Sequence, residues 1–380
     1  MSARIVCVAD FRSAIARAPP GRVMRPVSLA LSILQNRIGA TPRPGWCTYL
    51  VCYRCNARCQ MCDSWRVRPG DEMTPEQVDL VFGKLGRLDV VRLTGGEPFL
   101  RGDMVEIAEA VLRQSRPGVI HITTNGSFPD RVVDFVARFS RRDRLRFMVS
   151  FDGQEAEHDR NRGEEVTFAL AMETVRRLVS LRARTGLEVS ANHTVISPRS
   201  LEDNEGLRER LGALGVDVHM VLAYADSAMY GAKRRGTRAE DLIVADGYPL
   251  HPDLNGADVK GFVARELSRV DAFGSRMLRW GKRYYLRGLQ ARLNGGGGAR
   301  PRPPCVALRS HIRLLPDGSV PVCQFNTQTV GNLVRDSFEE VWHRRPETRA
   351  SRQWVDACPG CWAECEVMPN AIYSGDILRG

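Results

Sequence analysis

Three cysteines near the front of the chain, Cys55, Cys59 and Cys62, are separated by three and two residues. Thiolates are soft ligands that suit iron–sulfur clusters or zinc. At this spacing three thiolates can hold three corners of a cubane cluster and leave the fourth iron without a protein ligand. Structural zinc sites usually take four ligands in paired spacing, so the missing fourth favours iron–sulfur chemistry over zinc.

Five more cysteines lie near the other end of the chain, and they could serve a second metal site. Seventeen residues separate the first two, and the last three form a closely spaced group. Four of the five thiolates could hold a second cluster, and a zinc ribbon is the alternative that the spacing permits. The five are Cys305, Cys323, Cys358, Cys361 and Cys365.

The remaining cysteines are Cys7, Cys47 and Cys52, which we interpret as small buried residues rather than ligands. Eleven cysteines is an odd number, and the start of the chain lacks a secretory signal. Both observations argue against a disulfide framework. We therefore expect a reduced, cytoplasmic protein.

From Trp46 onward, strand-like and helix-like segments alternate, and these elements must position the front cysteines. One helix start is well marked, because Thr74, Pro75 and Gln77 form a capping box with proline in the first turn. Six strand-then-helix units predict a parallel sheet with helices outside, curled into a partial (β/α)6 TIM-like barrel. We expect strands at 47–51, 90–94, 119–124, 145–151, 187–195 and 216–223, and further helices at 104–114, 131–139, 168–184 and 204–214.

Small polar residues and glycines follow the predicted strands. In such barrels the chemistry takes place at the carboxyl ends of the strands, where the cysteine loop also lies. Glycines let a ligand approach the backbone, and a carboxylate there could pair with an ammonium group. The motifs are Gly95-Gly96-Glu97, Asn125-Gly126 and Ser150-Phe151-Asp152-Gly153.

The ordered set CxxxCxxC, GGEP, TNG and SFDG over residues 46–225 resembles the radical S-adenosylmethionine (radical SAM) superfamily. The resemblance implies that Cys55, Cys59 and Cys62 hold a [4Fe–4S] cluster whose open iron binds SAM. It implies that Gly95, Gly96 and Glu97 recognise the SAM amino group, and that Asn125 belongs to the same cofactor-binding set. It also implies contacts to ribose, carboxylate or substrate from Ser150, Asp152, Arg162 and Asn192. We interpret His158, in the same segment as Arg162, as a surface histidine or one that supports the site rather than a catalytic one.

The C-terminal segment resembles the auxiliary-cluster domains called SPASM and, in shortened form, twitch. Gly331-Asn332-Leu333 and Val341-Trp342 add to that resemblance. The full SPASM pattern has more cysteines than the five present here, so we predict one auxiliary [4Fe–4S] cluster. We expect its ligands to be Cys305, Cys323, Cys358 and Cys361, with Cys365 as a competing ligand, a free thiol or a hydrogen donor.

Changes in composition and the stretches rich in glycine and proline divide the chain into four expected parts. Residues 1–44, with seven arginines and one acid, form a basic extension with one helix, which we interpret as packed on the domain. Residues 45–225 form the barrel, 226–299 a connecting region that is irregular to 258 and then helical, and 300–380 the auxiliary domain. In the last part, Pro316-Asp317-Gly318 predicts a hairpin between 312–315 and 320–323, and 338–343 a short helix.

The composition is that of an ordinary globular protein, with 43% hydrophobic and 26% charged residues in 380. No apolar run approaches the ~18–20 residues of a membrane-spanning helix. The net charge is +11, but no basic block is interleaved with aromatic residues, so we predict no nucleic-acid partner. An acidic flavodoxin or ferredoxin is the reductant that the resemblance implies and that the charge suits.

The resemblance implies that SAM is cleaved reductively to a 5′-deoxyadenosyl radical, which removes a hydrogen atom from the substrate. With an auxiliary cluster to take an electron, we expect oxidation (dehydrogenation) of a small natural-product-type molecule. Peptide maturation and epimerisation are the alternatives, and an apolar N-terminal stretch is the only support for a lipid substrate. A zinc-binding scaffold without enzyme activity is the hypothesis of another class, and metal content distinguishes it.

Overall fold

The computed structural model describes residues 26–235, 243, 246–273, 276–295 and 298–379. Cys7 and most of the basic N-terminal extension lie outside these residues. Among the helices of the described part, none is both long enough and apolar enough to cross a membrane.

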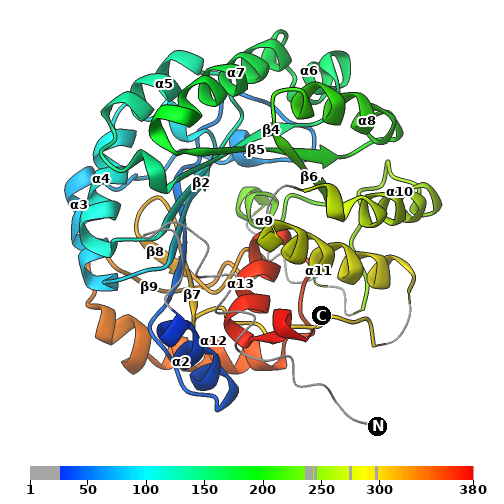
Figure 1. The fold of residues 1–380 in the computed structure, drawn as a ribbon. Helices are drawn as coiled ribbons and strands as arrows, with labels where there is room; N and C mark the ends of the chain where they lie inside the picture. The colour runs from blue at the N-terminus through cyan, green and yellow to red at the C-terminus, as the bar shows by residue number, and fades with distance from the viewer. Residues whose placement is uncertain (1–25, 236–242, 244–245, 274–275, 296–297, 380) are drawn as a thin grey trace.

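Seven parallel strands form the main sheet, in the order β6-β5-β4-β3-β2-β1-β7. The sheet curves, and helices line its outer side (Figure 1). The predicted partial TIM-like barrel is confirmed. Each of the six predicted strands lies within one residue of its predicted bounds, and the sheet contains a seventh strand, β7, that was not predicted to join it. The strands are β1 (Trp46–Cys52), β2 (Val90–Gly95), β3 (Val119–Thr124), β4 (Leu145–Phe151), β5 (Glu188–Val195), β6 (Asp217–Leu222) and β7 (His311–Leu314).

Six helices follow the barrel strands. The predicted capping box of the first one forms, because the Thr74 side chain accepts from Gln77 N while the Gln77 side chain accepts from Thr74 N. The last begins at Pro198, six residues before its predicted start, because Ser197 caps it. These helices are α3 (Pro75–Leu85), α4 (Met104–Ser115), α5 (Pro129–Arg138), α6 (Glu155–Arg162), α7 (Thr167–Thr185) and α8 (Pro198–Gly212).

Buried and half-buried residues alternate along β3, β4 and β5. The buried set, which includes Ile122, Val149 and Ala191, forms one core with helix residues such as Phe82 and Val175. The other set must point to the inside of the curve, since successive side chains of a strand point to opposite faces. This inner face is polar: it includes Arg92, Thr94, His121, Thr123, Arg146, Ser150, Ser190 and Asn192.

The hairpin predicted between 312–315 and 320–323 is wrong. β7 instead pairs in parallel with β1, with Thr48 opposite Arg313. β8 (Ser319–Pro321) pairs antiparallel with β9 (Thr329–Asn332). The tight turn between β7 and β8 does form, so the local signal was right and the strand partners were not.

Packing explains why β7 joins the barrel. Its outward residues Ile312 and Leu314 are completely buried in the main core. On the other side, His311 Nε2 lies 3.0 Å from Thr48 Oγ1 on β1. Both faces of β7 therefore find partners on the barrel, which a hairpin with β8 would not provide.

Helices from both ends of the chain complete the fold. α2 lies against α13 (Figure 1), and Asn36 Nδ2 donates to Tyr373 O at 3.0 Å, so the N-terminal helix packs on the domain as expected. The segment expected to be irregular, 225–258, contains α9, and the helical stretch after it is two helices. These helices are α2 (Pro26–Arg37), α9 (Met229–Arg235), α10 (Gly256–Ser268), α11 (Arg276–Leu293), α12 (Pro346–Ala357) and α13 (Glu364–Ser374).

Short helical turns join several of these elements. The helix expected at 338–343 is a single turn of π-helix, Glu340–Arg344. The 3-10 turns are Ser64–Arg66, Pro98–Leu100, Arg142–Arg144, Val270–Ala272 and Asp376–Leu378.

Candidate functional site

The loop after β1 brings Cys55, Cys59 and Cys62 to the carboxyl edge of the sheet, each half-buried. Burial raises the pKa of Cys55 to about 11 and that of Cys59 to about 12, and it also raises the pKa of Cys62. The thiols are therefore protonated at neutral pH in the metal-free protein. Binding iron requires them to release protons.

Backbone amides face two of these sulfurs. The N–H of Ala57 points at Cys55 and the N–H of Ser64 at Cys62, each two residues after its cysteine, and both lower the thiol pKa against the effect of burial. Hydrogen bonds to sulfur stabilise the thiolate that a metal requires. The front cysteines therefore fit a cluster in their local geometry.

The glycines of the GGE motif let the cysteine loop approach β2. Gly95 has φ +134°, and a Cβ on Gly96 would lie 2.0 Å from Arg54 O. Gly96 N donates to Cys52 O and Glu97 N to Arg54 O, each at 2.8 Å. These glycines are needed to seat the loop that leads into Cys55.

The carboxylate of Glu97 lies among three hydrogen-bond donors. Its side chain is completely buried, with Oε1 accepting from Phe99 N (3.0 Å) and Thr124 Oγ1 (2.8 Å), and Oε2 from Asn125 N (2.7 Å). Burial raises the pKa of this carboxyl, against the effect of these donors. Glu97 thus joins the ends of β2 and β3. Its Oε2 has one donor, Asn125 N, and a carboxylate oxygen can accept a second hydrogen bond.

Asn125 is held beside the cysteine loop. Its Nδ2 donates to Asn56 Oδ1 at 2.8 Å and lies 3.9 Å from Cys55 Sγ. Gly126 has φ +77°, and a Cβ there would lie 2.9 Å from Ala171 Cα. The TNG motif therefore combines a polar group at the cysteines with a turn that only glycine fits easily.

A buried ion pair lies under the cysteine loop. Arg162 Nε and Nη2 donate to the two carboxylate oxygens of Asp152, at 2.5 and 3.0 Å. Although burial acts to raise it, Arg162 holds the pKa of Asp152 below its ordinary value. Asp152 is completely buried, and both of its carboxylate oxygens contact Arg162. The other N–H groups of Arg162 remain for a further acceptor.

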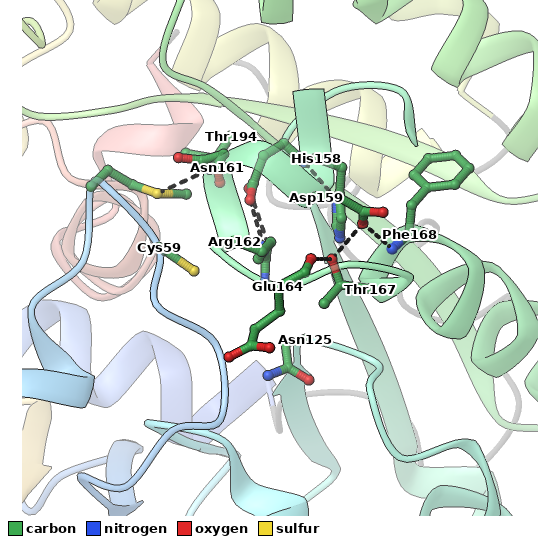
Figure 2. Close-up of polar contacts among 12 residues, drawn as sticks. Cys59, Asn125, His158, Asp159, Asn161, Arg162, Glu164, Thr167, Phe168 and Thr194 are labelled. Atoms are coloured by element: carbon green, nitrogen blue, oxygen red, sulfur yellow. Dashed lines mark hydrogen bonds and ion pairs between the residues drawn. The ribbon is translucent and has the colours of Figure 1, made fainter. Parts of the chain in front are cut away.

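The end of α6 contacts the cysteine loop directly. Arg58 N donates to Arg162 O at 2.8 Å and Gln60 N to Asn161 O at 3.1 Å. Figure 2 shows Cys59, Asn161 and Arg162 close together. The predicted carboxylate-binding arginine and the predicted cluster ligand are therefore neighbours.

The other predicted residues fall into two groups. His158 is completely buried, packs against Phe151 and Phe168, and accepts from Asp152 N at 3.2 Å, so it is not a surface residue. Ser150 and Asn192 are on the inner face, where Asn192 Oδ1 is buried without a partner among the described residues.

Sequence reasoning missed Tyr230, on α9. Its hydroxyl donates to Gly95 O at 2.9 Å, and its ring meets that of Tyr53 edge to face at 6.3 Å. Its place near Cys62 makes it part of the front site. The signal was the short apolar helix pattern of Met229, Tyr230 and Ala232 inside a segment expected to be irregular.

Backbone amides also face four of the five C-terminal cysteines. Cys323 Sγ accepts from Phe325 N (3.4 Å) and Asn326 N (3.2 Å), and Cys358 Sγ from Gly360 N (3.4 Å). The amide two residues on likewise faces the sulfur of Cys305 and of Cys361. Four sulfurs with this arrangement fit a second cluster.

Cys365 differs from these four. Its thiol donates to Gln324 Oε1 at 2.6 Å, and Arg313 Nη2 lies 3.9 Å from its sulfur. Arg313 in turn pairs with the buried Glu366 at 2.6 Å. Within the described residues, no three His, Cys, Asp or Glu side chains converge on a single-ion site.

Two family models match the chain, one over each cysteine group. Residues 49–211 match the radical SAM superfamily. Residues 305–365 match SPASM, an iron–sulfur cluster-binding domain. The first domain implies a [4Fe–4S] cluster and SAM, and the second implies auxiliary iron–sulfur binding.

Among curated proteins, the chain is 40% identical over 87 residues to a GTP 3′,8-cyclase of Aquifex aeolicus, covering 20% of this chain and 26% of that protein. It is 31% identical to a GTP 3′,8-cyclase of Synechocystis sp., covering 40% of this chain and 45% of that protein. The chain thus spans less than half the length of these relatives. It is 26% identical to the pre-heme d1 synthase of Dinoroseobacter shibae, covering 76% of this chain and 70% of that protein.

Two solved structures share the fold. SuiB of Streptococcus suis, bound to its precursor peptide SuiA, has a TM-score of 0.58 at 12% identity and covers 87% of this chain and 72% of its own. The enzyme anSMEcpe with bound AdoMet has a TM-score of 0.55 at 16% identity and covers 88% and 95%.

Proposed function

The chain carries a radical SAM domain followed by an iron–sulfur cluster-binding SPASM domain, and from this premise we propose that it oxidises a small natural-product-type substrate. When bound, the front cluster supplies the electron that splits SAM into methionine and a 5′-deoxyadenosyl radical, and the auxiliary cluster receives an electron from the substrate. In the net oxidation the substrate carbon loses a hydrogen atom, and then an electron and a proton.

The observation that carries this proposal is that three half-buried thiols lie beside polar groups to which a second molecule could bind. Cys55, Cys59 and Cys62 hold the front cluster. Arg162, with N–H groups left over from its pair with Asp152, binds the SAM carboxylate. Gly95 and Gly96 seat the cysteine loop and Asn125 borders it, so the same framework holds ligand and cluster.

The substrate lies on the inner face in this proposal. Ser150 and Asn192 are paired in register on β4 and β5, and both keep exposed surface toward the inside of the curve. Asn192 Nδ2 donates to Thr194 Oγ1 at 3.3 Å, which leaves its buried Oδ1 to accept from a bound hydroxyl or amine.

Cys305, Cys323, Cys358 and Cys361 hold the auxiliary cluster. Their backbone hydrogen bonds stabilise thiolates in a largely apolar setting. Electrons for the front cluster come from a flavodoxin or ferredoxin, whose acidic surface suits a chain of net charge +11.

Peptide modification is the second candidate. The SuiB structure with its precursor peptide has the same fold over most of this chain, so the fold can accommodate a peptide. Epimerisation would need a hydrogen donor, for which Cys365 is the available thiol beside the C-terminal group.

Anaerobic reconstitution tests the proposal. The protein is loaded with iron and sulfide, treated with dithionite and SAM, and assayed for 5′-deoxyadenosine. We expect about eight irons per chain and deoxyadenosine from the parent, and none from a variant with Cys55, Cys59 and Cys62 changed to alanine. Cys47→Ala, a buried thiol of β1 outside the site, is the control and keeps the activity. Zinc in place of iron, or deoxyadenosine from the triple variant, would contradict the proposal.

A further inference from the structure

Three arginines, one histidine and one threonine form a row at one level of the inner face. Strand register aligns Arg313, Thr48, Arg92, His121 and Arg146. Residues paired in register on neighbouring parallel strands point to the same side of a sheet. The row therefore crosses β7, β1, β2, β3 and β4.

Two of the three arginines in this row are neutralised within the protein. Arg146 Nε lies 2.5 Å from Glu188 Oε2. Arg313 Nη2 lies 2.6 Å from Glu366 Oε1, and Oε2 of the same carboxylate lies 3.1 Å from His311 Nδ1. These carboxylates are therefore already engaged.

Arg92 has no comparable partner. In the described part of the chain its side chain makes no hydrogen bond and no ion pair, and its Nε is buried without an acceptor. Its strand neighbours Val91 and Leu93 are completely buried on the helix side, so the exposed part of Arg92 opens to the inner face. A buried charged donor without an acceptor is costly, and an oxygen from a bound molecule would satisfy it.

His121, beside Arg92 in register, has the same deficit, because its Nδ1 is buried without a partner. Burial, followed by the charges of Arg92, His219 and Arg146, holds the pKa of His121 well below its usual range. The ring is therefore neutral at pH 7. It contributes a hydrogen bond and no charge, so Arg92 and His121 together offer one positive charge.

We propose that Arg92 and His121 bind a carboxylate group of the substrate on the inner face. This inference rests on the proposed function, since it names the substrate class of that site. A guanidinium matches both oxygens of a carboxylate, and a single charge matches a monoanion better than a phosphate dianion. Arg92 precedes Gly95 by three residues, or about 10 Å along β2, so the reacting carbon lies several bonds from the carboxylate.

A role at the auxiliary cluster is the competing explanation for Arg92. Burial raises the pKa of the Cys365 thiol to about 11, and Arg313 and Arg92 act against that rise, so the charge of Arg92 reaches this cysteine. The experiment must therefore measure ligand binding and cluster potential separately.

The test uses the full chain, reconstituted anaerobically with SAM bound, and propionate and propionamide as probes in calorimetric titrations. The variants are Arg92→Gln, Arg92→Lys and His121→Phe, with the exposed Arg176→Gln as control. We expect saturable binding of propionate but not of its amide. Arg92→Gln weakens propionate binding at least about tenfold, His121→Phe weakens it less, Arg92→Lys retains part of it, and Arg176→Gln equals the parent.

Several results would overturn the assignment. They are no saturable propionate binding to the parent, equal binding to the parent and Arg92→Gln, binding of propionamide as tight as that of propionate, or stronger competition from inorganic phosphate. A shifted auxiliary-cluster potential in Arg92→Gln, followed by electron paramagnetic resonance, with propionate binding unchanged, would assign Arg92 to the cluster instead.

Two further measurements are made. The first tells whether the carboxylate belongs to a peptide or to a small molecule, and the second distinguishes failure of this inference from failure of the proposed function. Displacement of propionate by a short peptide with a free C-terminus, but not by its C-terminal amide, indicates a peptide acid, and lack of displacement indicates a small molecule; either upholds a carboxylate site. Iron content and substrate-free deoxyadenosine formation are measured on the same samples. Loss of deoxyadenosine in the parent contradicts the proposed function, whereas loss of propionate binding alone contradicts only this inference.

Discussion

The two cysteine groups are built differently. The front sulfurs border buried polar groups: the Arg162–Asp152 pair, Glu97 and Asn125. Four of the five C-terminal cysteines, Cys305, Cys323, Cys361 and Cys365, lie in or against the main apolar core. Backbone amides from two residues on face sulfurs in both groups. The difference in their surroundings supports the proposal that the front group shares its cluster with a second molecule, whereas the C-terminal group encloses its own.

Each group also has one cysteine beside an arginine that is itself in a buried ion pair. In front, Cys59 lies near Arg162, which pairs with Asp152. At the back, Cys365 lies near Arg313, which pairs with Glu366. In the proposed function Cys59 is one of the three ligands of the front cluster, whereas Cys365 lies outside the four proposed ligands of the auxiliary cluster.

The largest expected effect tests this contrast at the back. Cys323→Ala removes a sulfur that accepts two backbone amides, so we expect iron to fall from about eight to about four per chain, with the front cluster retained. Cys365→Ala, the matched control, keeps about eight. Iron and labile sulfide after reconstitution give the answer. Equal iron loss in both variants would show that Cys365 is a ligand like the others.

In the front region, the buried Arg162–Asp152 ion pair should contribute strongly to the stability of the fold. Arg162→Gln leaves the Asp152 charge buried and unpaired, so we expect the free energy of unfolding of the metal-free protein to fall by about 3–5 kcal/mol. Urea titrations measure it. The double variant Arg162→Gln, Asp152→Asn should recover part of the loss, because no charge is left unpaired. A double variant as unstable as the single one would mean that packing, not charge, dominates here.

The two regions should respond to acid at different pH. Burial lowers the pKa of His158 to about 4, so between pH ~6.5 and 4 the unfolded state gains a proton that the folded state does not, and stability falls by up to about 3 kcal/mol. At the back, burial acts to raise the pKa of Glu366, but Arg313 and His311 hold it well below its ordinary value, so that contribution is lost only at lower pH.

His158→Phe tests this contribution, since it cannot titrate. Its unfolding free energy, measured by urea titration at several pH values, should fall less steeply from pH 6.5 to 4 than that of the parent. Parallel curves for the two proteins would assign the acid sensitivity to other groups.

The smallest expected effect concerns Tyr230, which connects α9 to the front site. Tyr230→Phe removes only the hydroxyl that donates to Gly95 O, so we expect a loss of about 0.5–1.5 kcal/mol and unchanged iron content. Urea unfolding and iron analysis of the same preparation check both. Iron loss on this change would make Tyr230 part of the cluster's support rather than an outer contact.

Local patterns predicted most of the barrel. The strands from β1 to β6 are short apolar or alternating segments, small polar motifs mark the ends of β2, β3 and β4, and the capping box of α3 was visible in Thr74 and Gln77. The cysteine spacing gave both metal groups, and the preference for Cys305, Cys323, Cys358 and Cys361 over Cys365 agrees with the backbone amides. The ligand set remains a prediction.

Non-local partners could not be predicted from those patterns. The turn after β7 was correct, but nothing local to Ile312 and Leu314 says that they pair with β1 rather than β8. The motif around Glu97 also does not say that Thr124 and Asn125, at the end of β3, donate to its carboxylate. In both cases the outcome depends on groups distant in the sequence.

The pairing of β1 with β7 has a consequence for synthesis of the protein. Trp46 on β1 pairs with His311 on β7, which is synthesised about 260 residues later. At ~5–20 residues per second the ribosome needs roughly 10–50 s to make that stretch. During that time β1 has an open edge, the kind of surface that other chains can pair with. A nascent chain halted before β7 would therefore be the form most exposed to aggregation, and chaperone demand should peak just before translation ends.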